Sequence, residues 1–335
     1  MVGAKKPLVG VVIPAYKVSA HILSVLSSLG PEISQICVVD DACPEQSGQI
    51  VEREFLDDRV TVLYHDTNQG VGAAMKTGFR EILKRDVDVI VKLDGDGQMD
   101  PTYIKDLVTP IINGLADYTK GNRFRFMESI HHMPKIRYLG NIGLSILSKA
   151  STGYWNIFDP NNGFVAISAP VLREINLDKV SRRYFFESDM LFRLSLIRAK
   201  VLDVPMRARY GDEKSNLSIL KASIEFPMKH LRNFFKRILI LYFIRDFSFP
   251  SLQLLLGTSL TLSGSIIGLH NFFRSQELGV NTAPGTLILF AVLFLTGVQF
   301  LLGFITHDLQ SVPNRTISQD LRLVQDRPTS EKDHW

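Results

Sequence analysis

Short apolar runs alternate with segments of helical apolar spacing from the start of the chain to Gly95, and this alternation limits the possible folds more than any other feature. The runs are "LVGVVIPAY", "ISQICVVDD", "VTVLYH" and "VDVIVKLDG". Continuous apolar runs of this length are typical of strands that are buried on both faces. Because helical segments lie between them, the sequence predicts an α/β fold in which a mostly parallel sheet carries helices on both faces.

Polar residues stand at the ends of three of these runs. The carboxyl ends of parallel strands meet at one edge of a sheet, and ligands bind there in open α/β folds. We therefore expect one polar rim, formed by Pro14, Ala15 and Tyr16, by Asp40 and Asp41, and by Asp94 and Asp96.

The fourth run leads into Asp94, Gly95, Asp96, Gly97 and Gln98. Two carboxylates and an amide oxygen at alternate positions point the same way if the chain turns sharply, and the glycines permit such a turn. Oxygen ligands of this kind suit Mg²⁺ or Mn²⁺; the alternative is an acidic turn that only faces solvent. A cation held by two carboxylates and a diphosphate describes a nucleotide-sugar site, where it would stabilise the departing nucleoside diphosphate.

The other rim residues are candidates for binding the nucleotide of such a donor. Asp40, with Asp41 beside it, could accept hydrogen bonds from the ribose or the base. Pro14, Ala15 and Tyr16 could form a wall under the base.

The segment "NQGVGAAMKTG" carries glycines at the start of a helix. It is not a dinucleotide fingerprint, because Met75 stands where a third glycine or alanine should be and the segment follows the third strand rather than the first. It is not a P-loop either, since no Gly-Lys-Ser/Thr follows. A glycine-rich helix start still suits a nearby diphosphate, which makes Gly70 and Lys76 further candidates for donor binding.

Two apolar segments follow an aromatic and basic stretch, "IEFPMKHLRNFFKRILILYFIRDFSFP", whose composition favours the membrane–water interface. Ser251–Phe273 and Thr286–Thr306 each hold about twenty residues without Lys, Arg, Asp or Glu, enough to cross a bilayer. A pair of buried core helices is the alternative. The positive-inside rule places both ends in the cytoplasm and the connecting loop outside. The flanking basic residues are Lys229, Arg232, Lys236, Arg237 and Arg245 before the first segment, and Arg315, Arg322 and Arg327 after the second.

Composition and the chain ends agree with a cytoplasmic catalytic domain attached to a membrane. No apolar stretch near the N-terminus is long enough for a signal peptide, and the two cysteines are expected to be reduced. The net charge of +4 does not suggest nucleic acid but fits a surface near lipid headgroups. Gly257, Gly264 and Gly268 could let the membrane helices pack against a second copy, which would make a homo-oligomer.

These observations predict four segments. They are a glycosyl-donor-binding α/β domain over 1–215, juxtamembrane amphipathic helices over 216–249, two transmembrane helices over 250–306, and a cytoplasmic tail over 307–335. The polar part of this tail after Val312 is expected to be mobile.

Four motifs, "VVIPAY", "VVDDACPEQSG", "NQGVGAAMKTGF" and "KLDGDGQMDP", resemble in order and spacing the opening motifs of inverting family 2 glycosyltransferases of the GT-A fold. The chain is most similar to the polyprenyl-phosphate branch, which includes dolichyl-phosphate mannose and glucose synthases. The resemblance covers about the first two thirds of the chain. It implies a Rossmann-like GT-A domain, a nucleoside-diphosphate sugar as donor and a polyprenyl phosphate as acceptor. It also implies that Asp94, Asp96 and Gln98 bind the metal.

Later motifs match the family more loosely. "GNRF" and "KIRYLGN" resemble segments in which an arginine meets phosphate, which implies that role for Arg123 and Arg137. Gly140 stands where the family often has serine, and "DPNNGFV" places Val165 where an arginine is usual, so acceptor recognition matches less closely than donor binding. "RYGDEKSNL" resembles a late segment of the family, which implies that Arg209, Lys214 and Ser215 close over the diphosphate.

The chemical nature of the acceptor determines which residues must take part in catalysis. A phosphate acceptor is ionised near neutral pH, so the protein must mainly align it and neutralise its charge. A hydroxyl acceptor on a glycan or glycolipid needs a general base, for which Glu187 and Asp189 in "FFESDM" are candidates. The same pair could instead be the acidic start of a helix, or position a sugar. A third alternative is an inactive domain that serves as a membrane scaffold or as a partner of a flippase.

Overall fold

The computed structural model describes residues 6–125, 135–207 and 219–325. It contains two compact units: residues 1–234 with residues 313–335 make up the first, and residues 235–312 make up the second. The boundary between them falls within helix α9 (Ile219–Leu239). The four functional segments predicted from the sequence stay a prediction.

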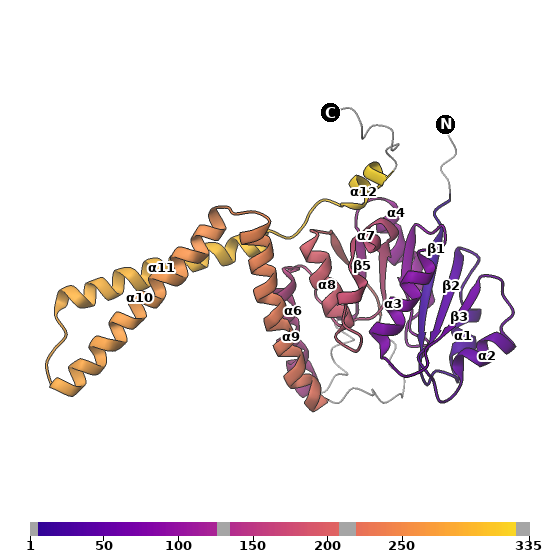
Figure 1. Cartoon of the computed structure of the whole chain (residues 1–335), viewed down its shortest axis with the longest axis horizontal. Helices are drawn as coiled ribbons and strands as arrows, with labels where there is room; N and C mark the ends of the chain where they lie inside the picture. Colours follow the sequence, from indigo (N-terminus) through magenta and orange to yellow (C-terminus); the bar gives the residue numbers. More distant parts are fainter. Residues whose placement is uncertain (1–5, 126–134, 208–218, 326–335) are drawn as a thin grey trace. The chain divides into compact units, whose positions relative to one another are not determined.

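A sheet of seven strands within the described residues forms the centre of the first unit (Figure 1). All of them run parallel except β6, which is antiparallel to both of its neighbours, so the prediction of a mostly parallel sheet is confirmed. The strands are β1 (Val9–Ala15), β2 (Ile33–Asp40), β3 (Val60–Tyr64), β4 (Val89–Lys92), β5 (Tyr118–Asn122), β6 (Val165–Ser168) and β7 (Val201–Pro205), in the spatial order β3-β2-β1-β4-β6-β5-β7.

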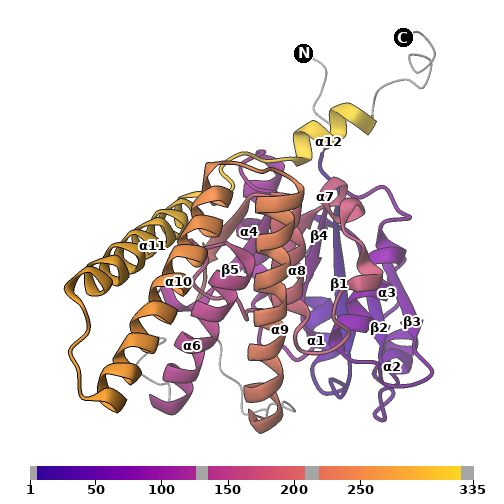
Figure 2. The same cartoon turned by 60° about the vertical axis from the view of Figure 1, so that its left-hand side comes forward.

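Helices cover both faces of this sheet, as predicted (Figure 2). Helices α1 and α4 pack on one face, and α3 packs on the other, against β1 and β2. The helices wholly within the first unit are α1 (Ile22–Ser27), α2 (Ser47–Glu54), α3 (Val71–Ile82), α4 (Ile104–Ile112), α6 (Lys135–Thr152), α7 (Ala169–Glu174), α8 (Phe186–Leu196) and α12 (Ser318–Gln325), with short 3₁₀ turns at Pro101–Tyr103, Arg123–Arg125 and Leu177–Lys179.

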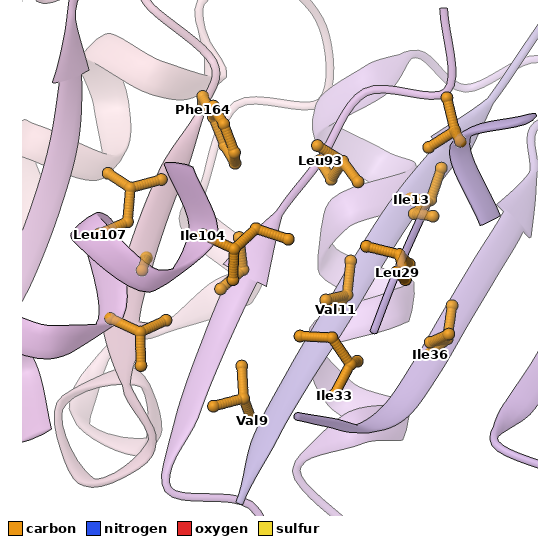
Figure 3. Packing of buried hydrophobic residues seen from close by; sticks show 14 of the residues in the cluster. Val9, Val11, Ile13, Leu29, Ile33, Ile36, Leu93, Ile104, Leu107 and Phe164 are labelled. Carbon is orange, nitrogen blue, oxygen red and sulfur yellow. The ribbon is translucent and has the colours of Figure 1, made fainter. Parts of the chain in front are cut away.

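Alternate residues of β1 build the two cores. Val11 and Ile13 lie in a buried apolar cluster with Leu107 of α4 (Figure 3). Val12 points to the opposite face, where Gly78 of α3 allows close approach: a Cβ at Gly78 would lie 2.3 Å from the Val12 side chain. The continuous apolar run therefore reflects a strand that is buried on both faces.

After the second unit the chain docks on the first unit at Asp117, the residue before β5. The fully buried Asp117 carboxylate accepts hydrogen bonds from the backbone N–H groups of Lys200, Ile317 and Ser318 at 2.8–3.1 Å. Ser318 begins α12, so the carboxylate satisfies donors at the start of that helix. The expected mobility of the tail is therefore wrong for residues 317–321, and its last ten residues lie outside the described part of the chain.

The second unit consists mainly of two long helices, α10 (Phe249–Leu278) and α11 (Pro284–Gln310). Both are long and apolar enough to cross a membrane, and 11% of the most apolar window of each is buried. Such an exposed apolar surface fits lipid better than a protein core. The two segments predicted as transmembrane lie within these helices.

The glycines predicted to promote self-association pack α10 against α11 instead. A Cβ at Gly257 or Gly264 would come within 3.0 Å of a neighbour in α11, and one at Gly268 would lie 2.7 Å from the ring of Phe290. The homo-oligomer stays a prediction, now without support from these residues.

A buried ion pair closes one end of the second unit. The Arg237 guanidinium contacts both carboxylate oxygens of Asp308, at 2.6 and 2.9 Å. Tyr242, in a π-helical turn (Ile240–Ile244), donates its hydroxyl to the same carboxylate at 2.7 Å. Loss of one partner would leave a buried charge uncompensated, which typically costs about 3–5 kcal/mol.

Asp117→Ala should weaken the docking of the C-terminal segment, because three backbone N–H groups lose their acceptor. We expect the free energy of unfolding to fall by about 2–4 kcal/mol. Hydrogen–deuterium exchange of the purified protein should quicken at Ile317 and Ser318. Asp58→Ala, at an exposed aspartate, is the control. Unchanged exchange at these two amides in the Asp117 variant would contradict the assignment.

Candidate active site

The carboxyl ends of β1, β2 and β4 meet at one edge of the sheet, as the sequence predicted. Ala15 at the end of β1 pairs with Asp40 at the end of β2, and β4 ends beside β1 at Lys92. Tyr16 follows β1 directly and is 36% exposed at this edge. The residues proposed from the sequence for the base, the ribose and the metal thus begin from neighbouring strand ends.

Asp40 is held by the backbone that follows it. Its two carboxylate oxygens accept hydrogen bonds from the N–H groups of Cys43 and Gly48, each at 2.7 Å. Gly48 lies in the first turn of α2, so a buried negative charge stands at the positive end of that helix. Local backbone donors thus fix the orientation of Asp40 at the rim.

Asp41 organises the glycine-rich turn before α3. Its carboxylate accepts from the N–H groups of Gln69 and Gly70, at 2.9 and 2.7 Å, and lies 2.6 Å from Nδ1 of His65. Gly70 has φ +97°, a conformation that favours glycine. Asp41 therefore fixes the loop after β3.

The segment 178–183 packs against the start of α3. Ala73 donates its N–H to the carbonyl oxygen of Arg182 at 2.8 Å, and a Cβ at Gly72 would lie 2.2 Å from the carbonyl oxygen of Ser181. Lys76 donates to backbone carbonyls of the same segment, at 3.3 Å each. The structure thus brings Gly70 and Lys76 against this segment of the protein.

The turn proposed to bind metal has the geometry that its glycines permit. Gly97 adopts φ +75°, and Gly95 is approached by the side chains of Val18 and Ile22, which lie 3.2 and 3.0 Å from where its Cβ would be. The backbone N–H of Gln98 donates to Oδ1 of Asp96 at 3.0 Å. Both aspartates of the turn are partly exposed.

A lysine that sequence reasoning did not single out lies at the centre of the site. Lys92 is 1% exposed; its Nζ lies 2.6 Å from Oδ1 of Asp94 and 3.5 Å from Oε1 of Glu187. Burial by itself lowers the pKa of Lys92, but the two carboxylates outweigh it and hold that pKa above its usual value. The signal in the sequence was a lone charged residue inside an apolar strand.

The structure separates the two acidic residues at the start of α8. Glu187 faces Lys92, whereas Asp189 accepts from the N–H of Ser181 at 2.8 Å and contacts Arg193 at 3.2 Å. Of the two candidate bases, only Glu187 contacts Lys92, which in turn contacts Asp94. Asp189 instead anchors the segment that covers the start of α3.

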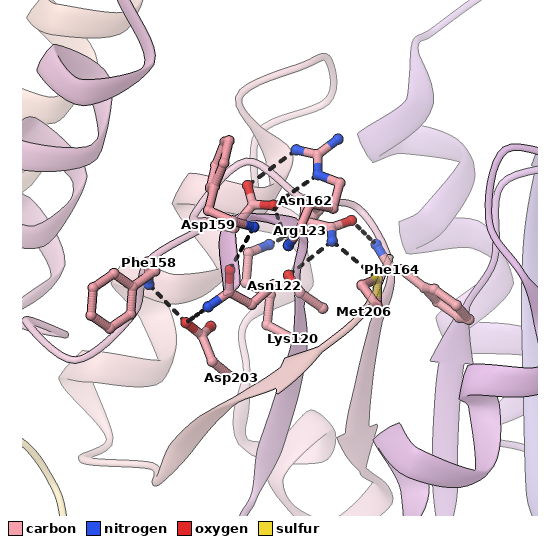
Figure 4. A network of polar contacts seen from close by, with 11 residues as sticks. Lys120, Asn122, Arg123, Phe158, Asp159, Asn162, Phe164, Asp203 and Met206 are labelled. Atoms are coloured by element: carbon pink, nitrogen blue, oxygen red, sulfur yellow. Dashed lines mark hydrogen bonds and ion pairs between the residues drawn. The ribbon is translucent and has the colours of Figure 1, made fainter. Parts of the chain in front are cut away.

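Arg123 follows β5 and is held by a residue that the sequence did not point to. The buried Asp159 carboxylate binds its guanidinium at 2.8 and 3.1 Å, and the Arg123 side chain stays 36% exposed (Figure 4). Because β5 runs in the same direction as β4, Arg123 leaves the sheet at the same edge as Asp94. This fixed and partly exposed guanidinium suits an anionic ligand.

A second buried lysine, Lys120, and the half-buried Asp203 complete the network in Figure 4. Lys120 donates to the carbonyl oxygen of Asn162, and burial lowers the pKa of its ammonium to about 8, although Glu187 acts in the opposite direction. Asp203 accepts from Asn122 at 3.0 Å and from the N–H of Phe158 at 2.8 Å.

Several predicted site residues lie outside the described part of the chain. Arg209, Lys214 and Ser215 fall in residues 208–218, and Arg137 lies on α6 with its side chain undescribed. Within the described ranges, no three or more His, Cys, Asp or Glu side chains gather as a metal site.

A family model and several known proteins match this chain. The model of glycosyl transferase family 2 matches residues 10–175. An undecaprenyl-phosphate mannosyltransferase of Micrococcus luteus is 31% identical over 199 residues, 58% of this chain and 81% of the relative. A UDP-N-acetylglucosamine–dolichyl-phosphate N-acetylglucosaminyltransferase of Methanococcus voltae is 28% identical over 219 residues, 61% of this chain and 87% of the relative.

A solved structure shares the fold. Glucosyl-3-phosphoglycerate synthase of Mycobacterium tuberculosis, in complex with Mn²⁺, UDP and phosphoglyceric acid, aligns with a TM-score of 0.51 at 17% identity, over 69% of this chain and 78% of that chain. This likeness confirms the GT-A type of fold that the sequence motifs implied.

Asp203→Asn should make the first unit more stable at neutral pH. Burial, as the main cause, raises the pKa of Asp203 from 3.8 to about 6. A raised pKa means that the protonated carboxyl favours the fold, so its contribution is present below about pH 4 and is lost as the pH rises through about 6. The neutral amide avoids that loss, and we expect a gain on the order of 2 kcal/mol at pH 7 and none at pH 4.

Thermal unfolding of the purified protein between pH 4 and pH 8 measures this difference. Asp58→Asn is the control, because that side chain is exposed. An Asp203 variant whose stability follows that of the unmodified protein at every pH would contradict the raised pKa.

Proposed function

This chain belongs to glycosyl transferase family 2 and is a glycosyltransferase, and on that premise we propose that it moves a sugar, with inversion at the anomeric carbon, from a nucleoside-diphosphate sugar to a polyprenyl phosphate. The observation that carries the proposal is the shared rim: the carboxylate pair of Asp94 and Asp96 and the anchored guanidinium of Arg123 follow strands that end at one edge of the sheet. The two carboxylates suit a cation that binds a diphosphate, and the guanidinium suits an acceptor phosphate. The polyprenyl-phosphate sugar transferases among its relatives support this choice of acceptor.

The residues present fit a divalent cation. Asp94 and Asp96 lie in one tight turn, and both are partly exposed. Gln98 lies in the same turn, two residues after Asp96. Mg²⁺ and Mn²⁺ accept one or two carboxylates when substrate phosphates and water complete the coordination, so two carboxylates are enough for this assignment. When bound, the cation would neutralise negative charge on the departing nucleoside diphosphate.

The remaining donor contacts are assigned to the rim. We assign the base to the wall of Pro14, Ala15 and Tyr16, and the ribose to Asp40, whose carboxylate is already fixed by backbone donors. Asp41 contributes to donor binding indirectly, because it holds the loop that contains Gln69 and Gly70.

Other predicted donor residues are assigned by their contacts. We assign Gly70 and Lys76 to seating the segment 178–183 rather than to touching the donor. Arg209, Lys214 and Ser215 are proposed to close over the diphosphate.

The acceptor phosphate needs alignment more than a base. It is ionised near neutral pH, so its oxygen can attack the anomeric carbon directly while arginines neutralise its charge. Arg123 suits this role because Asp159 fixes its guanidinium in place before the acceptor arrives. Arg137 is proposed as the second phosphate contact.

We also propose that the second unit lies in the membrane and that the catalytic unit and both chain ends are cytoplasmic. Two crossings return the chain to the side from which it left, which agrees with the docking of Ile317 and Ser318 on Asp117 of the first unit. Basic residues before α10 and after α11 support the cytoplasmic side.

The reaction itself can be tested with the purified full chain. Radiolabelled UDP- or GDP-sugar, Mg²⁺ or Mn²⁺, and a polyprenyl phosphate should place label in the organic phase as an acid-labile lipid. Asp96→Ala or a chelator should lower the initial rate about 100-fold or more, because the diphosphate loses its counter-charge. Asp58→Ala should keep the normal rate. Label found only in water-soluble or hydroxyl-linked products would exclude the proposed acceptor.

Glu187→Gln distinguishes a phosphate acceptor from a hydroxyl acceptor. With a phosphate acceptor the variant should keep kcat within about 10-fold of normal, because no proton has to be removed, whereas loss of a general base costs about 10²–10⁴-fold. Asp189→Asn is measured beside it, since the amide oxygen can still accept from Ser181. A loss of two or more orders of magnitude in either variant, with normal folding, would favour the hydroxyl acceptor.

A further inference from the structure

We propose that Lys92 is a positioning residue of the transfer reaction: its buried ammonium joins Asp94 of the metal-binding turn to Glu187 of α8 and fixes both carboxylates for donor binding. The inference rests on the proposed function, because it assigns Asp94 to the cation and the donor. It goes further in giving a role to Lys92, which opens the motif "KLDGDGQMDP" and to which the resemblance assigned none.

The geometry of Lys92 is that of a shared counter-ion. Lys92 is the last residue of β4, and its Nζ lies 2.6 Å from Asp94 and 3.5 Å from Glu187. The lysine side chain is 1% exposed, that of Glu187 is 13% exposed and that of Asp94 is 30% exposed. The charge is therefore buried beneath the rim, and its partners reach from the protein interior toward solvent.

Burial makes this contact strong and directional. A buried ammonium is tolerated when carboxylates pair with it, and two carboxylates near one point need a positive charge between them. Because Oδ1 of Asp94 is held by Lys92, the carboxylate cannot rotate without breaking the ion pair. Its second oxygen thus keeps one orientation relative to the turn.

A glycine closes the space around the ammonium. A Cβ at Gly163 would lie 2.5 Å from Nζ of Lys92 and 3.2 Å from Oδ2 of Asp94. Gly163 precedes Phe164 and β6, so the connection between Asp159 and β6 lies against the ion pair at this residue. The same connection carries Asp159, which anchors Arg123. The contact of Lys92 thus lies between the cation turn and the segment that holds the proposed phosphate ligand.

A second lysine supports this segment from the neighbouring strand. Val165 of β6 pairs with Lys92 on one side and with Lys120 on the other. Directly paired residues of antiparallel strands project from the same face of a sheet. Lys120 donates to the carbonyl oxygen of Asn162, next to Gly163. Positive charge at this point therefore comes from the two strands that flank Val165.

Gly163→Ala moves the ammonium without changing any charge. We expect the affinity for UDP or GDP in the presence of Mn²⁺ to fall about 10-fold or more, since a displacement of about 1 Å can cost 100-fold at a reacting site. Gly285→Ala is the matched control, because a Cβ there meets nothing within 4 Å. Titration calorimetry on the full chain, with each nucleotide and Mn²⁺, measures the affinity. An unchanged affinity in a folded Gly163 variant would overturn the proposal.

Removing the ammonium separates positioning from simple charge balance. Lys92→Met should lower the melting temperature, because two carboxylates lose their counter-ion, and Lys92→Met with Glu187→Gln should restore most of it. If Lys92 positions Asp94, the double variant still binds the nucleotide about 10-fold more weakly than Glu187→Gln alone. A double variant that recovers both melting temperature and affinity would mean that Lys92 only balances charge, and the proposal would fail.

These measurements do not depend on the acceptor. If nucleotide affinity falls as expected but no polyprenyl-linked sugar forms, the role of Lys92 stands and the proposed acceptor fails. If the unmodified chain binds neither UDP nor GDP with Mn²⁺, the proposed donor site itself fails.

Discussion

The candidate active site depends on how buried and half-buried carboxylates at the carboxyl edge of the sheet are neutralised. Removing a carboxylate from water is costly unless hydrogen bonds or an opposite charge replace the lost solvation. The chain meets this requirement in two ways. Asp40 and Asp41 take backbone N–H groups from the segments that follow them, whereas Asp94 and Glu187 share the ammonium of Lys92. Each solution also ties a loop to the rim, so the charges that we propose to bind the donor also shape the candidate site.

Close packing of backbone on glycine gives the rim its second constraint. Gly72 and Gly163 have no room for a side chain, because Ser181 and Lys92 lie within 2.5 Å of where a Cβ would be. The segment around Ser181 thus packs against the glycine-rich start of α3, and the buried ammonium of Lys92 packs against Gly163. At Gly72, a glycine in a segment that suited diphosphate binding thus serves first to let protein approach protein.

The second unit, with its two long apolar helices, is inserted between two segments of the first unit. The chain leaves the first unit through α9, passes through α10 and α11, and docks again where Ile317 and Ser318 meet Asp117. Within the second unit, glycines pack α10 against α11 and the buried pair of Arg237 and Asp308 closes one end. Two helices that expose apolar surface along most of their length are thereby joined to the α/β unit through two connections rather than one.

The strands, the mostly parallel sheet, the rim and the two long apolar helices could be predicted from the sequence because local patterns control them. Apolar runs without polar interruption identify strands that are buried on both faces, and segments of about twenty apolar residues identify helices that suit a bilayer. The acidic turn could be found because its glycines and aspartates are neighbours in the chain. Tertiary structure alone decided which groups neutralise these charges. Lys92 contacts Glu187, Arg123 contacts Asp159, and Asp117 accepts a hydrogen bond from Ile317. The partners of each pair are far apart in the sequence. The energy of such contacts depends on burial and distance, which a local sequence pattern does not contain.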